Sequence, residues 1–284
     1  MSNPSLDGSV QATFSGADHN GTPLALTTAN ANDTLVVITS AEPNNTNAVS
    51  VSTVTNTGTA TLSWTKYKAL TFVQSNGSTG CIEVWSASAP LAGTYNITVT
   101  YNISIDDACI VACGVTGAVG FDSGIYTTAT GTGPSPAPTV TGITSAGGGL
   151  FIIAADSAGP NLFTFGTAPT NLTTNILEQA KNVAGSQFNC LGTYYGTSTG
   201  SVSGQTIAST DSVAGVWGMM VFALTSAAPV LNTITTNLSG ISQAAASLYP
   251  RITQTLHGVS QLASGGPLAA PGNTAFTSSW SAGP

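Results

Sequence analysis

Apolar and polar residues alternate along much of this chain with a period of two, which is the pattern of half-buried β-strands. In residues 81–87, for example, Ile82 and Val84 face one way while Glu83 and Trp85 face the other. Similar runs occupy 34–39, 49–55, 61–67, 94–103 and 108–115. Turn residues separate them at intervals of about eight to twelve residues, which predicts an antiparallel sandwich or barrel.

The strand pattern recurs in the second half of the chain. A Gly-, Thr- and Pro-rich segment at 117–138 has the composition of a connector. Four later runs then resemble earlier ones: 145–156 the segment 33–38, 187–195 the strand at Cys81, 200–208 the strand at Tyr95, and 217–224 the strand at Cys109. Residues 173–183 fit either a helix or a strand.

Residues 1–228 are therefore predicted to be one β-sandwich built from two related halves, 1–116 and 139–228. A sheet from one half alone would leave an apolar face uncovered, so the sheets of both halves are expected to pack together. Two separate sandwiches are the alternative.

Residues 229–284 have a different pattern and are predicted to be an assembly segment and tail. The ten residues 234–243 are echoed by 252–261 in the form I-T-x-x-L-x-G-[IV]-S-Q. Two short repeats rarely bury a core alone, so they are expected to pack on the sandwich or on repeats of neighbouring subunits. Their spacing permits a helix, but the Thr density and two glycines favour short strands. The predicted contact residues are Ile234, Leu238, Ile241, Ile252, Leu256, Val259 and, as an aromatic anchor, Trp280.

Charge is scarce in this sequence. The 284 residues contain four Lys and Arg against eleven Asp and Glu, a net charge of -7, whereas about a quarter of the residues are charged in an ordinary domain. The hydrophobic fraction of 42% supplies a core and argues against a disordered chain. Catalysis, metal binding and phosphate binding need ionisable groups that converge. We therefore predict a non-enzymatic protein without cofactors, whose hydroxyl- and amide-rich surface suits self-association.

The candidate reactive residues have simpler interpretations. Asp18 and His19 could belong to a Ser-His-Asp triad, but no nucleophile motif accompanies them, and residues 18–21 have the composition of a loop turn. The acids available for a glycosidase pair are Glu83, Asp106, Asp107, Asp122, Asp156 and Glu178, and the sequence brings no two of them together. The adjacent acids 106 and 107 are interpreted as a turn, with a Ca²⁺ site as the alternative.

Several partner classes are not expected. Four basic residues are too few for nucleic-acid binding, and Lys66 and Lys68 are interpreted as solvated strand residues. No signal peptide and no run of about 18 apolar residues occurs, so synthesis in the cytosol without a membrane span is expected. The cysteines at 81, 109, 113 and 190 lack metal-site spacing and are predicted to be buried thiols, with a disulfide as the alternative.

Aromatic side chains are the remaining candidates for contact with a ligand. An exposed aromatic face on a sandwich could stack on sugar rings, which is the basis of a carbohydrate-binding alternative. Trp85 and Trp217, however, lie in apolar strands and are predicted to be core residues.

Three segments resemble a jelly-roll-like sandwich found in proteins of tailed bacteriophages and their hosts. They are Asn-Asp-Thr-Leu-Val-Val-Ile at 32–38, Ile-Glu-Val-Trp-Ser-Ala-Ser-Ala-Pro-Leu-Ala-Gly at 82–93 and Tyr-Asn-Ile-Thr-Val-Thr at 95–100. The C-terminal repeats resemble short repeats in similar proteins.

This resemblance implies a structural protein of the virion surface, either a capsid decoration or head-fibre protein or, as the alternative, a tail fibre or adhesion module. It implies a homo-oligomer, with a trimer favoured, assembled in the host cytoplasm. Its expected partners are other virion proteins, above all the major capsid protein, and a host surface glycan for the adhesion alternative. No catalytic residues are carried over.

Overall fold

Every regular element in the described part of the chain is a β-strand. The computed structural model describes residues 3–21, 23–43, 46–73, 77–133, 139–145, 149–157, 164–165, 172, 175–184, 187–197, 202–210 and 215–226. None of these residues belongs to a helix of the length and apolarity that a membrane crossing requires. The predicted all-β class is confirmed for these residues.

The first half of the chain forms a seven-stranded antiparallel sheet. Its strands are β1 (Ser5–Asn20), β2 (Leu24–Thr28), β3 (Asp33–Pro43), β4 (Val51–Gly58), β5 (Thr65–Val73), β6 (Thr79–Ala89) and β7 (Gly93–Thr116). The main path is β1-β7-β3-β6-β5. The N-terminal part of the long strand β7 pairs with β2 and β4 instead, so β7 takes part in two layers.

The second half forms a five-stranded and a three-stranded sheet. Its strands are β8 (Ala118–Gly133), β9 (Thr139–Ser145), β10 (Gly149–Ser157), β11 (Thr164–Phe165), β12 (Asn175–Ala184), β13 (Gln187–Thr197), β14 (Val202–Thr210) and β15 (Gly215–Ser226). The larger sheet has the order β12-β13-β10-β15-β8, and the smaller has the order β11-β14-β9.

The two halves repeat one topology. Reversing the second path gives β8-β15-β10-β13-β12, in which each strand corresponds by chain order to its counterpart in β1-β7-β3-β6-β5. The strands β14 and β15 together correspond to the single strand β7, and β9 and β11 pair with β14 as β2 and β4 pair with β7. The strand correspondences predicted from the sequence for the strands at 81, 95 and 109 are those found in the topology.

Irregularities of pairing are repeated as well. The register of β5 on β6 shifts between Lys66 and Lys68, and that of β12 on β13 shifts between Ile176 and Glu178. When the halves are aligned through the β3–β6 and β10–β13 registers, the two shifts fall at the same place. Lys68 then corresponds to Glu178. A shared β-bulge at an equivalent place is a strong sign that the halves are copies of one unit.

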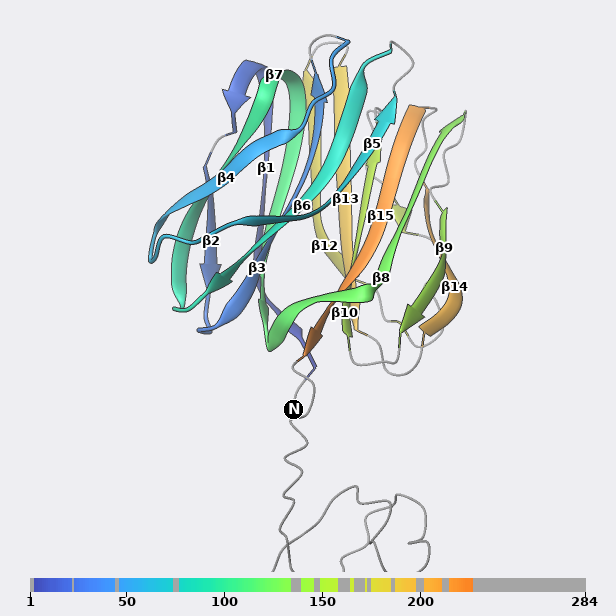
Figure 1. Cartoon of the computed structure of the whole chain (residues 1–284). Helices are drawn as coiled ribbons and strands as arrows, with labels where there is room; N and C mark the ends of the chain where they lie inside the picture. The colour runs from blue at the N-terminus through green and yellow to red at the C-terminus, as the bar shows by residue number, and fades with distance from the viewer. Residues whose placement is uncertain are drawn as a thin grey trace, which may run out of the picture. The chain divides into compact units, whose positions relative to one another are not determined.

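The strands build four layers, which Figure 1 shows from β2 and β4 on the left to β9 and β14 on the right. The two five-stranded layers face each other across a central core that includes Val36, Ile38 and Val111 from the first half and Ile152 and Phe222 from the second. Each of these layers buries its other face under a small outer layer of its own half. The prediction that the sheets of both halves pack together is confirmed, and the outer layers were not predicted.

Three sequence-based assignments were wrong. Most of the segment interpreted as a connector is strand β8, because it pairs along β15 from Gly120 to Gly133. The predicted strands 94–103 and 108–115 are one strand, β7. The strand β1 was not predicted, and its pairing with β7 extends over Asp18 to Asn20, which were interpreted as a turn. Pairing with a long neighbouring strand outweighed local turn composition in each case.

The ambiguous segment 173–183 is a strand in its described part, since β12 spans Asn175–Ala184.

Candidate functional site

The residues predicted for assembly lie outside the described part of the chain. All seven, Ile234 to Trp280, fall after residue 226, the last that the structure describes. The assembly role, the trimer and the boundary at 228 therefore stay predictions.

An aromatic cluster lies where β5 of the first half meets β8 and β15 of the second. The rings of Tyr67 and Phe121 stack with their centroids 3.7 Å apart and 9° between their planes. Tyr126 and Phe222 contact the Tyr67 ring edge-on, at 6.2 and 6.0 Å. Burial raises the pKa of the Tyr67 and Tyr126 hydroxyls, so both stay protonated at neutral pH. Tyr67, Phe121 and Tyr126 are all half-buried, and Phe222 is buried.

A lysine covers this cluster from the solvent side. The Lys68 Nζ atom lies 4.8 Å from the centroid of the Tyr126 ring and 5.7 Å from that of Tyr67, both within cation–π range. We call the group Tyr67, Lys68, Phe121 and Tyr126 the aromatic edge. It combines flat ring faces with an exposed positive charge.

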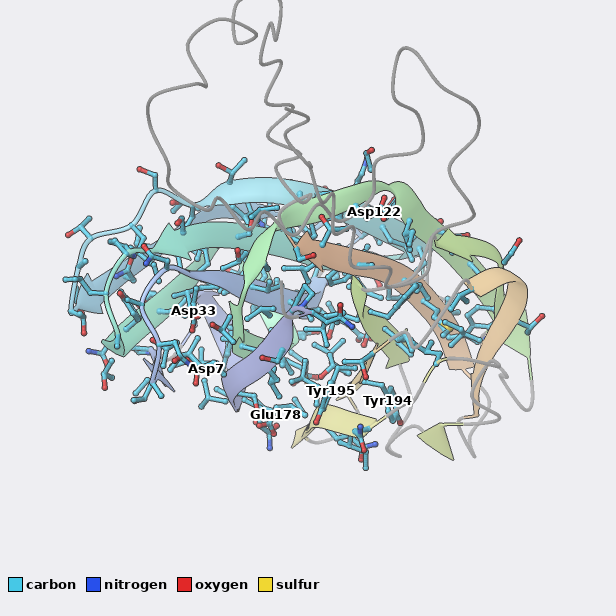
Figure 2. The ribbon with its side chains drawn as sticks, turned by 90° about the horizontal axis from the view of Figure 1, so that it is seen from below. Asp7, Asp33, Asp122, Glu178, Tyr194 and Tyr195 are labelled. Carbon is cyan, nitrogen blue, oxygen red and sulfur yellow. The ribbon has the colours of Figure 1, made fainter. Side chains whose placement is uncertain are left out.

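The opposite edge of the molecule holds the equivalent positions with different chemistry. When the two halves are aligned through their strand registers, Leu6 corresponds to Phe121 and Ser9 corresponds to Tyr126. There the Ser9 hydroxyl donates a 2.7 Å hydrogen bond to Glu178, which is the counterpart of Lys68. Figure 2 shows Glu178 on this edge and Asp122 at the other. The two halves share a scaffold, but only one edge is aromatic.

The acid Glu83 is used by the fold itself. Its side chain is buried and accepts hydrogen bonds from the Val51 backbone N–H at 3.1 Å and the Trp85 indole at 3.0 Å. It also forms an ion pair of 2.8 Å with Lys66, whose side chain is 38% exposed. Lys66 and Lys68 are both exposed residues of strand β5, as expected, and Lys66 in addition forms this ion pair.

The other acids considered for catalysis lie on four different strands, β7, β8, β10 and β12. Asp106 and Asp107 lie inside strand β7 and not in a turn, because β7 continues between β1 and β3. Burial and the neighbouring Asp106 raise the pKa of Asp107 to about 6. Asp122 accepts a 2.8 Å hydrogen bond from the Gly124 backbone N–H. Within the described residues, no group of three or more His, Cys, Asp or Glu side chains could hold a metal ion.

Buried thiols were predicted, and three of the four cysteines are buried thiols. Cys81, Cys109 and Cys113 are each inaccessible to solvent. Burial, with a smaller effect of Glu178, raises the pKa of Cys113 to about 12, so this thiol is neutral. The side chain of Cys190 lies outside the described atoms, as does that of His19. Trp85 and Trp217 are half-buried, and Trp85 packs against the core of the first half, so the prediction that both are core residues is only partly right.

Two neighbouring acids that were not predicted from the sequence, Asp7 and Asp33, lie at one end of the sandwich. Asp33 is fully buried at the start of β3, and Asp7 lies beside it in β1. Burial and the Asp7 carboxyl group raise the pKa of Asp33 to about 7. Desolvation is the largest single effect on Asp7 and raises its pKa, but the hydrogen bonds from Asp33, Asn30 and Ala29 together lower the pKa below its ordinary value. The sequence gives little indication of this pair. Asp33 directly precedes an apolar run, which is also a common place for a turn residue.

In comparisons with known proteins, no protein-family model, no curated protein and no solved structure matches this chain.

Proposed function

We propose that this chain is a non-enzymatic structural protein of a bacteriophage particle, a capsid decoration or head-fibre protein that assembles as a homo-oligomer on the virion surface. The observation that carries the proposal is the kind of side chain on the outward face of the strands. In β4 the exposed side chains are all hydroxyl-bearing, namely Ser52, Thr53, Thr55 and Thr57, and the one other exposed position is Gly58. Such a surface repels neighbouring copies weakly, because it has little charge.

The role of a buried charged residue supports the same proposal. The buried acid Glu83 holds three strands together through Val51, Trp85 and Lys66, so its charge serves the fold. The duplicated layers form a rigid scaffold of paired strands. Such a scaffold suits a protein that contacts its partners through its outer surface. The proposal includes the jelly-roll-like type of the sandwich and its origin in a phage. The proposed partner is the major capsid protein.

Sedimentation velocity tests the assembly part of the proposal. The full chain and a chain ending at residue 228 should be compared at the same concentration. We expect a closed oligomer, a trimer, for the full chain and a monomer for the shortened one. The shortened chain should still fold, since the three described cores lie between Leu24 and Leu224. A monomeric full chain, or an oligomer that survives the deletion, would contradict the proposed role of residues 229–284.

A second candidate function, carbohydrate binding in adhesion, is favoured by the aromatic edge. Flat rings of Tyr67 and Tyr126 next to the exposed charge of Lys68 could stack on a sugar and attract an acidic group. A glycan array should be probed with the wild-type protein, with Tyr126→Ala and with Ser9→Ala as the control at the equivalent position. Binding that only Tyr126→Ala abolishes supports this candidate, and binding to no glycan contradicts it.

A further inference from the structure

The carboxyl groups of Asp7 and Asp33 are hydrogen-bonded to each other at one end of the sandwich. Figure 2 shows the two residues close together, with Asp122 apart from them. An ionised carboxylate can only accept hydrogen bonds, so two ionised groups cannot form this bond. One of the two acids must therefore carry a proton in the folded structure.

The surroundings of the two acids decide which one is protonated. The Asp7 Oδ2 atom accepts hydrogen bonds from the backbone N–H groups of Ala29 at 2.9 Å and Asn30 at 2.8 Å, and such bonds favour the carboxylate. Asp33 is fully buried, which favours its neutral form, and it interacts with the side chains of Asp7 and Thr116. The proton therefore belongs to Asp33, whose O–H group donates to the Asp7 carboxylate.

Among the described residues, no positive charge offsets the ionised form of Asp33. Asp7 is the charged group that acts on it, and the two carboxylates would repel each other. The other residues around the pair do not titrate: residues 28–32 of the preceding turn, Ala89 of β6, and Gly114 and Thr116 of β7. The protonation of Asp33 thus decides whether the contact between the acids attracts or repels.

The acid pair fastens the end of strand β1 to the turn between β2 and β3. The pairing of β1 with β7 is interrupted between Leu6 and Ser9, where Gly8 has a φ of 90°. Residues 5–7 therefore form a short end of β1 beyond a bulge. Asp7, in this end, accepts the two hydrogen bonds from the turn. A short segment of this kind can separate from a sheet while the rest of the fold stays intact.

We propose that the acid pair is a pH-sensitive latch, which holds residues 5–7 against the turn of residues 29–32 when Asp33 is protonated and releases both when it ionises. On release the Asp33 O–H bond breaks, the proton passes to the solvent, and two carboxylates are left in contact. Their repulsion opposes the packing of Leu6 against the central core, which favours the closed state. The raised pKa of Asp33, about 7, places the release near neutral pH. The latch is independent of the proposed function.

Hydrogen–deuterium exchange of the full chain, followed by mass spectrometry, tests the latch. Uptake should be compared at about pH 5.5 and about pH 8, after correction for the intrinsic exchange rate of the amides. With an Asp33 pKa of about 7 in the closed state and 3.8 in the open state, the protection of residues 5–7 and 29–32 should fall by about 30-fold. Residues 150–155 in the centre of β10 should exchange more slowly at both pH values, because they open only when the whole molecule unfolds.

Two variants separate the latch from a purely structural role of the acids. Asp33→Asn and Asp7→Asn each replace one carboxyl group by an amide, whose NH₂ group can donate the hydrogen bond at any pH. Both variants should keep the two segments protected at about pH 8 and lose the response to pH. Asp122→Asn is the control, because the registers make Asp122 the counterpart of Asp7 in the second half, where Gly149 stands in place of Asp33. It should respond as the wild type does.

Three results would overturn the proposal. The first is a wild-type protein whose two segments keep the same protection at both pH values. The second is a loss of protection in residues 150–155 at the same rate as in the segments, since the whole molecule then unfolds. The third is a wild-type response in the amide variants. If one amide variant does not fold, the other variant and the wild type still decide.

Discussion

Glu83 and Asp33 are both buried carboxylates, but only Glu83 is surrounded by donors. Val51, Trp85 and Lys66 satisfy both of its oxygens. Such a group contributes to stability through its contacts, and removal of one partner of a buried ion pair is strongly destabilising. Asp33 has no comparable set of donors, so its ionised form is costly in the fold.

Glu83→Ala should lower the free energy of unfolding by about 2–4 kcal/mol, because it leaves the buried Val51 N–H and the half-buried Trp85 indole without their acceptor. Urea denaturation followed by tryptophan fluorescence measures this loss. Lys68→Ala is the control, since that side chain is exposed and its removal should cost less than about 1 kcal/mol. Equal effects of the two substitutions would contradict the structural role assigned to Glu83.

The acid pair predicts a pH dependence of stability. The pKa of Asp33 is raised to about 7 in the fold from an unfolded value of 3.8, so between these values the folded state binds more protons than the unfolded state. Stability should therefore fall as the pH rises from about 4 to about 7. Asp107, with a pKa of about 6, contributes to the same window. The Tm of Asp33→Asn should fall less over this range, and an unchanged slope would refute the assignment.

At the scale of elements, strand β8 depends on its pairing with β15. Its residues are rich in Gly and Thr, and only the neighbouring strand gives them a regular conformation. The Trp217 side chain of β15 lies directly over Gly131, where a Cβ atom would overlap the indole ring. Glycine at this position lets the tryptophan cover the strand.

Gly131→Ala should therefore destabilise the protein by about 1–3 kcal/mol, because the Trp217 ring must move. It should also shift the tryptophan emission spectrum, since the half-buried Trp217 would change its exposure. Thr130→Ala is the control on the same strand, at an exposed position. If Gly131→Ala matched the control in Tm and emission, the packing of Trp217 on β8 would be wrong.

Strands with many apolar residues could be predicted from the sequence, and strands defined by their pairing could not. The run at Ile82 and the run at Leu150 contain enough β-branched and apolar residues to be recognised alone. The strands β1 and β8 are polar or glycine-rich, and their identity depends on neighbours distant in the sequence. The aromatic edge and the acid pair were missed for the same reason, because each joins residues of different strands.

At the scale of the whole molecule, the described residues belong to one compact unit, residues 1–230. Within it, two copies of one strand topology share a central core, and each copy adds an outer layer. The duplication leaves two equivalent edges that differ in chemistry, one aromatic with Lys68 and one with the hydrogen bond from Ser9 to Glu178. If the protein binds a carbohydrate, we expect the binding site at the aromatic edge.

The sparse charge of the chain has a consequence at this scale. With a net charge of -7 and hydroxyl residues on outward faces, copies of the protein can lie next to each other with little repulsion. That property suits a component present many times on one particle, which is the central claim of the proposed function.

Quantitative mass spectrometry of purified phage particles tests this claim most directly. Particles should be produced from a host that carries the gene together with its neighbouring genes, and they should be banded by density before digestion. We predict that the chain is present in a fixed ratio to the major capsid protein and that the ratio survives a high-salt wash. Its absence from the particles, together with its presence in the unassembled fraction of the lysate, would contradict the account.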